Sequence, residues 1–158
     1  MFRELLRKNR QLSDEECVSI LINETRGVLS VLGDDGYPYG VPMNHYYNCD
    51  DGCIYFHCGK HGHRIDAIKN WNKVSFCVYD RGFRQADEWA YTVKSVIVFG
   101  KVEIIENTEK TTEITKSLSY KFTQDMDYIA NEIKSSVCNT ILIKLIPEHI
   151  CGKIVKEA

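Results

Sequence analysis

The sequence predicts a mainly β fold, an antiparallel barrel of six or so strands with helices packed outside it. Short segments rich in β-branched and aromatic residues recur along the chain, turn sequences separate them, and no βα unit repeats. The chain has 158 residues, of which 44% are hydrophobic and 27% charged. This is the composition of one globular domain, which we expect to span residues 1–158.

The first predicted element is a helix over residues 14 to about 25. Ser13 precedes three consecutive acids, so a hydroxyl can accept from the free amides of the first turn while the acids lie at the positive end of the helix dipole. We expect Gly27 to end this helix, and residues 28–32 to form a short strand.

Two turns organise the next segment. Asp34-Asp35-Gly36 favours positive φ angles and should join the first strand to one over residues 37–47. A second turn over residues 48–52 leads to a strand over residues 53–58. We therefore expect a three-stranded meander. The prolines at 38 and 42 cannot donate to a ladder, so the middle strand should lie at an edge.

The rest of the chain continues the pattern. Ile65, Ile68 and Trp71 recur at a spacing of three and predict a short helix after a glycine-flanked basic loop. Strands are expected over residues 74–79 and 91–105. Helical spacing over residues 108–134 predicts two helices broken near residues 123–125, and a last strand over 138–146 should stop at Pro147.

Composition argues against several classes of protein. A net charge of -2 and a pI near 6.2 disfavour nucleic acid as the main partner. No run approaches the ~20 apolar residues of a membrane helix, and the first residues lack a secretory signal, so we expect a cytoplasmic protein without a membrane partner. Seven cysteines, an odd number, fit a reducing compartment.

The densest chemical cluster is the segment from His57 to Arg64, which contains Lys60, His61 and His63. Basic side chains, glycines and a helix N-terminus together favour a phosphate site, although a solvated basic loop would have the same composition. Histidines and Cys58 are also metal-ligand types. The chain lacks the paired ligand spacing of structural zinc, so we predict no metal.

Two further segments are relevant to ligand binding. The proline-containing strand that includes Val41, Pro42, Met43 and Asn44 should leave main-chain groups free, and such groups can bind the edge of a flat ring; an ordinary barrel edge is the alternative. Lys94 and Ser95 open an apolar strand and by themselves indicate only exposure. No hydrolase triad or nucleophile elbow is present.

Several short motifs follow one another along nearly the whole chain: Met-Phe-Arg-Glu at the start, Asp35-Gly36-Tyr37-Pro38-Tyr39, Val41-Pro42-Met43-Asn44, Ile54-Tyr55-Phe56-His57-Cys58, Gly62-His63-Arg64-Ile65-Asp66-Ala67-Ile68, Val74-Ser75-Phe76-Cys77-Val78, Ser95-Val96-Ile97-Val98-Phe99-Gly100 and Glu148-His149-Ile150-Cys151-Gly152-Lys153. In this order the motifs resemble one family, the nitroimidazole-resistance (Nim-type) branch of the pyridoxamine-phosphate-oxidase-like superfamily.

The resemblance implies a split β-barrel homodimer with flavin mononucleotide (FMN) bound at the subunit interface by residues of both chains. Carried over by position, residues 41–44 would lie along the isoalloxazine. His57, Cys58 and Lys60 would approach the ribityl chain and phosphate, His63 and Arg64 would bind phosphate or flank the ring, and Lys94 and Ser95 would add phosphate contacts. Family members commonly have Lys at position 64 and Arg at 94, which changes the hydrogen-bond geometry.

The implied activity is reduction of nitroaromatic or nitroimidazole compounds through flavin N5, with His63 as a proton donor. Two alternatives share the fold: a non-catalytic flavin-binding protein, and a binder of haem or another small molecule. Residues 80–90 are expected to shape access of the small-molecule substrate. No nicotinamide fingerprint identifies an electron donor.

Overall fold

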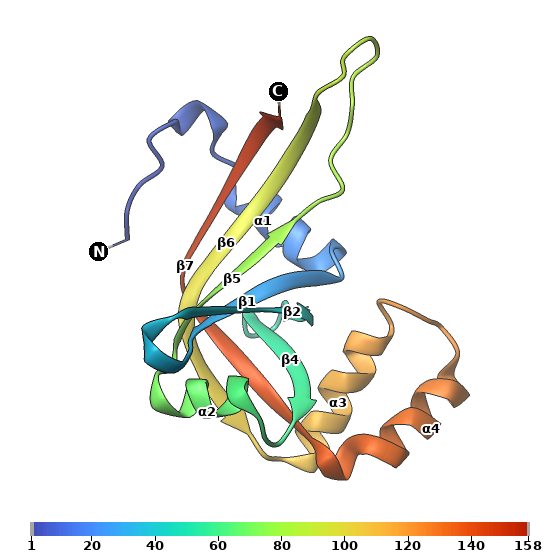
Figure 1. The fold of residues 1–158 in the computed structure, drawn as a ribbon. Helices are drawn as coiled ribbons and strands as arrows, with labels where there is room; N and C mark the ends of the chain where they lie inside the picture. Colours follow the sequence, from blue (N-terminus) through green and yellow to red (C-terminus); the bar gives the residue numbers. More distant parts are fainter. Residues whose placement is uncertain (1, 158) are drawn as a thin grey trace.

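The computed structural model describes residues 2–157, which form one seven-stranded antiparallel sheet with helices around it (Figure 1). The strand order is β2-β1-β5-β6-β7-β4-β3. The strands are β1 (Arg26–Leu32), β2 (Pro38–Asn44), β3 (Tyr46–Asn48), β4 (Cys53–Gly59), β5 (Lys73–Tyr79), β6 (Tyr91–Ile105) and β7 (Thr140–Glu157). The α-helices are α1 (Asp14–Asn23), α2 (His63–Asn70), α3 (Thr108–Ser119) and α4 (Met126–Ser136). The predicted mainly β antiparallel fold is confirmed, with seven strands in place of six.

A single residue, His45, connects the two edge strands of the sheet. β2 and β3 are separated in sequence only by His45, yet they lie at opposite ends of the strand order. The sheet must therefore curl until its two edges approach each other, and because no ladder joins those edges the barrel is split. The predicted continuous strand over 37–47 and the meander built on it are wrong. β2 pairs with β1, whereas β3 pairs with β4.

β6 and β7 are the longest strands and pair with each other at the centre of the sheet. The observed length of β7 shows that a second prediction was wrong. β7 does not stop at Pro147 but continues to Glu157. Phe99 pairs with His149 and Gly100 with Pro147, so one extra residue bulges out of β7 at this point. A proline without an amide hydrogen is tolerated at such a bulge because the ladder is already interrupted.

The helix ends follow local sequence closely. Ser13 caps α1, as the sequence predicted, and its own amide donates to the Glu16 carboxylate, which completes a capping box. Asn107 and Asp125 cap α3 and α4, and the break near 123–125 is confirmed. Gly27 does not end α1; it lies inside β1, where a Cβ atom would come within 2.5 Å of the Phe76 ring. Among the described residues, no helix is long and apolar enough to cross a membrane.

The core lies on the inner face of the curled sheet. α1 and α2 pack there against alternating strand residues such as Leu29, Phe56, Phe76 and Val98. The other face of β4 and β7 carries a smaller cluster with Ile114 of α3. The inner face is thus filled by side chains, and a ligand must bind at its rim or on the outside.

The outer face of β1, β5, β6 and β7 is half exposed. Along each strand the inward residues are buried while the alternate residues remain partly accessible. In the middle of the face these alternate residues are small or apolar: Val28, Ser30, Ser75, Cys77, Val93, Ser95, Ile97 and Cys151. Bulkier or charged side chains on the same face are Tyr79, Phe99 and Lys153. Phe2 of the N-terminal arm stacks on His149 and Phe99 at one end of this outer face.

His45, between β2 and β3, is a buried histidine. Its ring is 0% exposed, Nε2 donates to the Leu21 carbonyl at 2.8 Å, and Nδ1 is buried without a partner among the described residues. Burial, together with the Lys121 ammonium nearby, lowers the pKa of His45 from 6.5 to about 4. The folded protein therefore binds this proton less readily than the unfolded chain does.

We expect stability to be lost as the pH falls from 6.5 through 4. The contribution of His45 is fully present above 6.5, and its loss amounts to about 2–3 kcal/mol of unfolding free energy. Urea unfolding at pH 7 and pH 4 measures it. The loss should be smaller by that amount in His45→Gln and unchanged in His61→Gln, an exposed control; parallel pH profiles for wild type and His45→Gln would contradict the assignment.

Candidate functional site

The loop from β4 to α2 forms an open rim on the protein. Gly62 has φ 118°, a conformation that other residues rarely adopt, and it precedes the first turn of α2. A Cβ atom built on Gly59 or Gly62 would meet nothing within 4 Å. The amides of Ile65 and Asp66 donate to the Gly62 carbonyl, which leaves the first two amides of α2 as backbone donors for a ligand.

Arg64 provides the charge at this rim. Its Nη1 donates to the Met43 sulfur at 3.0 Å, and its Nε is buried without a hydrogen-bond partner among residues 2–157. Cys58 also touches this guanidinium: burial raises the pKa of the Cys58 thiol, and Arg64 partly opposes that rise. Arg64 as a whole is half-buried, and a guanidinium whose neighbours are two neutral sulfurs is an unneutralised positive charge, which favours an anionic ligand.

His63 is held by the β1–β2 hairpin. Its ring stacks on Tyr39 with centroids 4.3 Å apart, and Nε2 accepts from the Asp34 amide at 3.4 Å. The Asp34 carboxylate lies 3.5 Å from the same nitrogen. In the neutral ring with Nε2 as acceptor, the proton is on Nδ1. Sequence reasoning missed Tyr39 and Asp34 as partners; the alternation that places Tyr39 on the same face as Val41 was the available signal.

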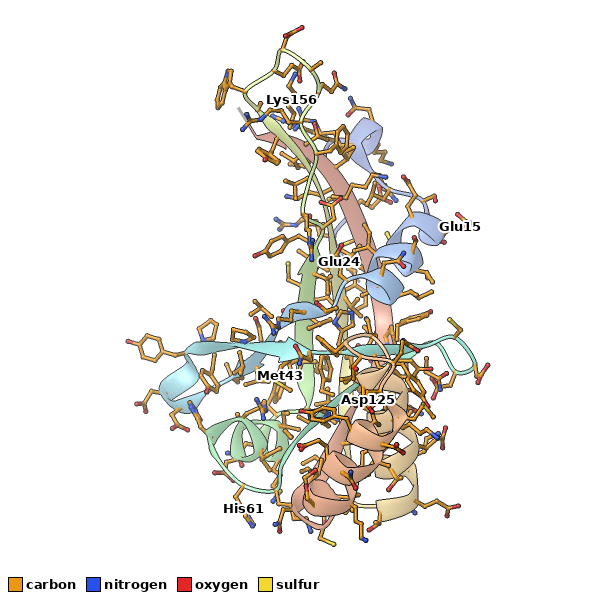
Figure 2. The ribbon with its side chains drawn as sticks, turned by 90° about the vertical axis from the view of Figure 1, so that its right-hand side faces the viewer. Glu15, Glu24, Met43, His61, Asp125 and Lys156 are labelled. Atoms are coloured by element: carbon orange, nitrogen blue, oxygen red, sulfur yellow. The ribbon has the colours of Figure 1, made fainter. Side chains whose placement is uncertain are left out.

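β2 presents its residues alternately. Val41 and Met43 point to the inner side with the core, and Pro42 and Asn44 point to the other side. Asn44 accepts from Arg26 at 3.0 Å. As predicted, the strand is an edge, since β2 is the first in the sheet order. Figure 2 shows Met43 on this strand and His61 on the loop before α2.

His57 and Cys58 face opposite sides of β4. Cys58 belongs with the inner cluster and Arg64, whereas His57 is on the side of Tyr55, toward α3. The Nδ1 of His57 is buried without a partner among residues 2–157, and burial lowers the pKa of this imidazole. Lys60 and His61 are exposed on the loop. Within one chain, then, Cys58 and Arg64 meet while His57 does not join them.

Lys94 and Ser95 lie far from this rim in the same chain. β4 ends opposite Thr140 of β7, and the nearby Leu142 of β7 pairs on its other side with Ile105, which is about 36 Å along β6 from Lys94. Lys94 instead forms an ion pair with Glu16 of α1 at 2.9 Å. Ser95, the next residue, points to the outer face. One chain therefore brings together residues of β2, β4 and α2, and leaves out the pair on β6.

A metal centre has no support in the part of the chain that the structure describes. No group of three histidine, cysteine or carboxylate side chains is arranged to hold an ion there. The seven cysteines are free thiols, of which Cys17, Cys53 and Cys58 are buried. The rim instead has the donor set of a phosphate site: one unneutralised guanidinium, glycines and helix amides.

Solved structures share the fold at low sequence identity. A Bacteroides thetaiotaomicron protein assigned provisionally to 5-nitroimidazole antibiotic resistance has a TM-score of 0.77 and 23% identity, covering 93% of this chain and 87% of that one. A conserved hypothetical protein from Mycobacterium tuberculosis has a TM-score of 0.79 and 18% identity, covering 95% and 90%. A FAD-binding protein from Mesorhizobium loti has a TM-score of 0.66 and 21% identity, covering 92% of this chain and 97% of that one.

No curated protein sequence matches the chain. The family model described as pyridoxamine 5'-phosphate oxidase matches residues 13–154, which include every strand but the last residues of β7. The resemblance drawn from the motifs is thereby confirmed at the level of the family, and the chain belongs to the pyridoxamine 5'-phosphate oxidase family.

Proposed function

We propose that this protein is an FMN-dependent oxidoreductase that reduces small molecules, with nitroaromatic compounds as the favoured substrate class. The observation that carries the proposal is Arg64, a guanidinium with a buried, unpaired Nε at an open helix N-terminus. A flavin phosphate would supply the missing anion. Family membership and the similarity to a flavin-binding structure support the choice of a flavin.

Different residues of the rim would contact different parts of FMN. Arg64, Lys60 and the first amides of α2 would hold the phosphate, and Cys58 would lie beside the ribityl chain. The isoalloxazine would lie along β2, whose prolines leave main-chain groups unpaired, with Val41 and Met43 on one side of the strand. When bound, FMN supplies a two-electron carrier that exchanges hydride at N5.

We propose further that the protein is a homodimer whose second copy covers the outer face of the sheet. The small, half-exposed residues of that face would allow close approach of a flat partner surface. Ser95 lies there and would then reach the partner's flavin phosphate, although it is remote from the rim of its own chain. Lys94 would not, because its ammonium is already paired with Glu16.

The first test is the absorbance spectrum of the purified protein, followed by identification of the released chromophore. Flavin bands with FMN released support the cofactor. Turnover of a nitroaromatic compound with a chemically reduced donor then supports the reaction, in which a nitro group needs six electrons and six protons to give the amine and two waters. A Soret band, or a colourless protein that takes up no added FMN, would overturn the proposal.

His63 is the proposed proton donor: in the doubly protonated ring Nε2–H would face the Asp34 carboxylate, 3.5 Å away, and Nδ1 would give up its proton. We expect His63→Gln to lower nitroaromatic turnover about 100-fold, in the range of general acid catalysis, and to flatten the pH–rate profile with little change in FMN affinity. His61→Gln, two residues away on the exposed loop, should leave turnover unchanged. A large loss of FMN affinity in His63→Gln with an unaltered pH profile would make His63 a phosphate ligand instead.

A further inference from the structure

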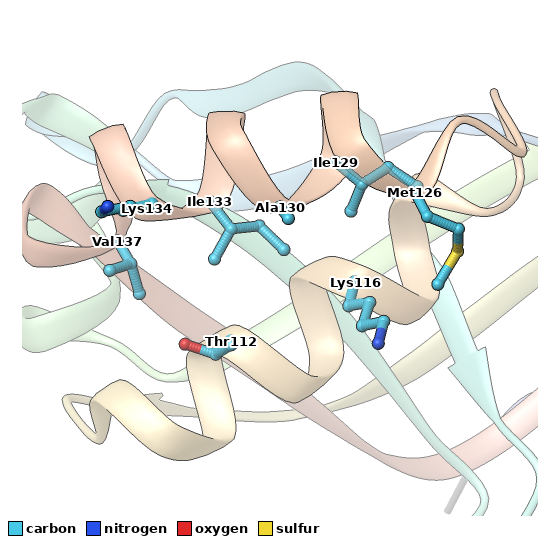
Figure 3. Close-up of a pocket in the computed structure, with 8 residues that line it drawn as sticks. All are labelled: Thr112, Lys116, Met126, Ile129, Ala130, Ile133, Lys134 and Val137. Carbon is cyan, nitrogen blue, oxygen red and sulfur yellow. The ribbon is translucent and has the colours of Figure 1, made fainter.

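A cavity lies between α3 and α4, apart from the rim at the β4–α2 loop where we propose that the flavin binds; we call that rim the flavin rim. It has a volume of about 430 Å³ and is lined by Thr112, Lys116, Met126, Ile129, Ala130, Ile133, Lys134 and Val137. This volume is within the range of small-molecule sites, about 300–1,000 Å³. Figure 3 shows the two helices side by side, with Ile129 and Ile133 pointing from α4 toward α3. We call this cavity the helix-hairpin groove.

The apolar side of α4 is larger than α3 covers. Met126, Ile129, Ala130, Ile133 and Val137 form one stripe at helical spacing. Ile129 and Ile133 are buried, but Met126 is 51% exposed and Ala130 is exposed. The hydroxyl of Tyr120 donates to the Met126 sulfur at 3.3 Å, which holds this side chain at one end of the groove. The stripe is thus incompletely packed along about 16 Å of helix.

The charged residues at the groove are all of one sign. Lys116 lies near Met126 at one end, and Lys134 lies near Val137 at the other (Figure 3). Neither lysine forms an ion pair with any residue from 2 to 157, and the nearby Glu113 is paired with Lys110. No acidic side chain lines the groove. An apolar slot with an unpaired ammonium at each end complements a molecule that is apolar in its body and anionic at its head.

We propose that the helix-hairpin groove binds a single-chain amphipathic anion, that is, an alkyl or acyl carboxylate whose chain lies along α4 and whose head pairs with a lysine. A small ligand fits better than a protein partner, because a stable protein interface buries more than about 1,000 Å², whereas a cavity of about 430 Å³ has the size of a small-molecule site. This site is independent of the flavin rim and does not rest on the proposed flavin chemistry.

The methionines provide a direct test. The chain has three, Met1, Met43 and Met126; Met43 touches Arg64 at the flavin rim and Met126 lines the groove. In protein labelled with ¹³C at the methionine methyls, decanoate should shift the Met126 signal and leave Met43 unshifted. Octanoate and hexanoate should bind progressively more weakly, by up to about fourfold for each methylene removed. Decyltrimethylammonium should bind much more weakly than decanoate.

Substitutions can distinguish decanoate binding in the helix-hairpin groove from decanoate binding elsewhere on the protein surface. Lys116→Glu and Lys134→Glu should each weaken decanoate binding roughly two- to fivefold, and the double variant should favour decyltrimethylammonium. Ala130→Trp adds a ring at an exposed position inside the groove and should abolish the Met126 shift. Lys73→Glu, an exposed lysine on β5, is the matched control and should change nothing.

Three outcomes would overturn the inference. One is no Met126 shift with decanoate. Another is an equal affinity for decanoate and decyltrimethylammonium, which would leave the lysines without a role. The third is a Met126 shift that depends on protein concentration in the absence of decanoate, since a second copy of the chain would then cover the groove.

Discussion

Gly100→Ala should destabilise the protein by about 3 kcal/mol, the largest loss of stability that we expect from a single added methyl group. A Cβ atom at Gly100 would overlap the carbonyl oxygen of Ile146 and would lie 2.9 Å from Leu145 Cδ1. Overpacking in a core costs about 1–3 kcal/mol, and here the main obstacle is backbone that cannot rotate away. Urea unfolding should show a lower midpoint with an unchanged slope.

Gly59→Ala is the matched control, because it adds the same methyl group to a strand where nothing lies within 4 Å. Its unfolding free energy should stay within about 0.5 kcal/mol of the wild type. Equal midpoints for the two variants would show that the bulge at Glu148, beside the Gly100–Pro147 pair, can relax, and that the register of β6 and β7 does not depend on a glycine.

Arg64→Met should weaken FMN binding about 10- to 150-fold, the equivalent of one charge-assisted hydrogen bond of about 1.5–3 kcal/mol. Methionine keeps much of the length of the arginine side chain and removes its charge. The protein without ligand should be as stable as the wild type or more so, because the change removes a buried Nε that has no partner in the described chain. Flavin fluorescence titration and thermal unfolding measure the two effects separately.

Two further variants sharpen this result. Arg64→Lys keeps the charge and should lose less affinity than Arg64→Met. Lys69→Met removes an exposed charge from the last turn of the same helix and should have no effect on FMN binding. If Arg64→Met and Lys69→Met bind FMN equally well, Arg64 does not hold the phosphate.

Features set by a few neighbouring residues were predictable from the sequence. The capping box at Ser13 depends on a side chain three positions away, and the hairpin turn depends on Asp35 and Gly36, which do have positive φ angles. The break before α4 depends on Asp125, whose carboxylate accepts from the Tyr128 amide. In each case the controlling contact lies within one helical turn or one β-turn, so the sequence pattern contains it.

Features that depend on contacts between residues far apart in the sequence were not predictable. No local signal marks His45 as the point where one predicted strand divides, because its burial against Phe76 and the Leu21 carbonyl exists only in the closed sheet. A proline usually ends a strand, yet Pro147 is accommodated by an irregularity that β6 helps to form. Likewise, the ion pair of Lys94 with Glu16 joins residues 78 positions apart, which spacing rules cannot detect.

The order of the strands has a consequence for synthesis on the ribosome. β4 pairs with β3 and β7, and the partner of His57 is Leu142, roughly 85 residues further along. At about 5–20 residues per second, an emerging β4 would wait on the order of 10 s for this neighbour. During that time its apolar inner face and one open edge would be accessible to other chains. Chaperone demand, rather than final stability, should therefore limit the yield of soluble protein when it is expressed rapidly.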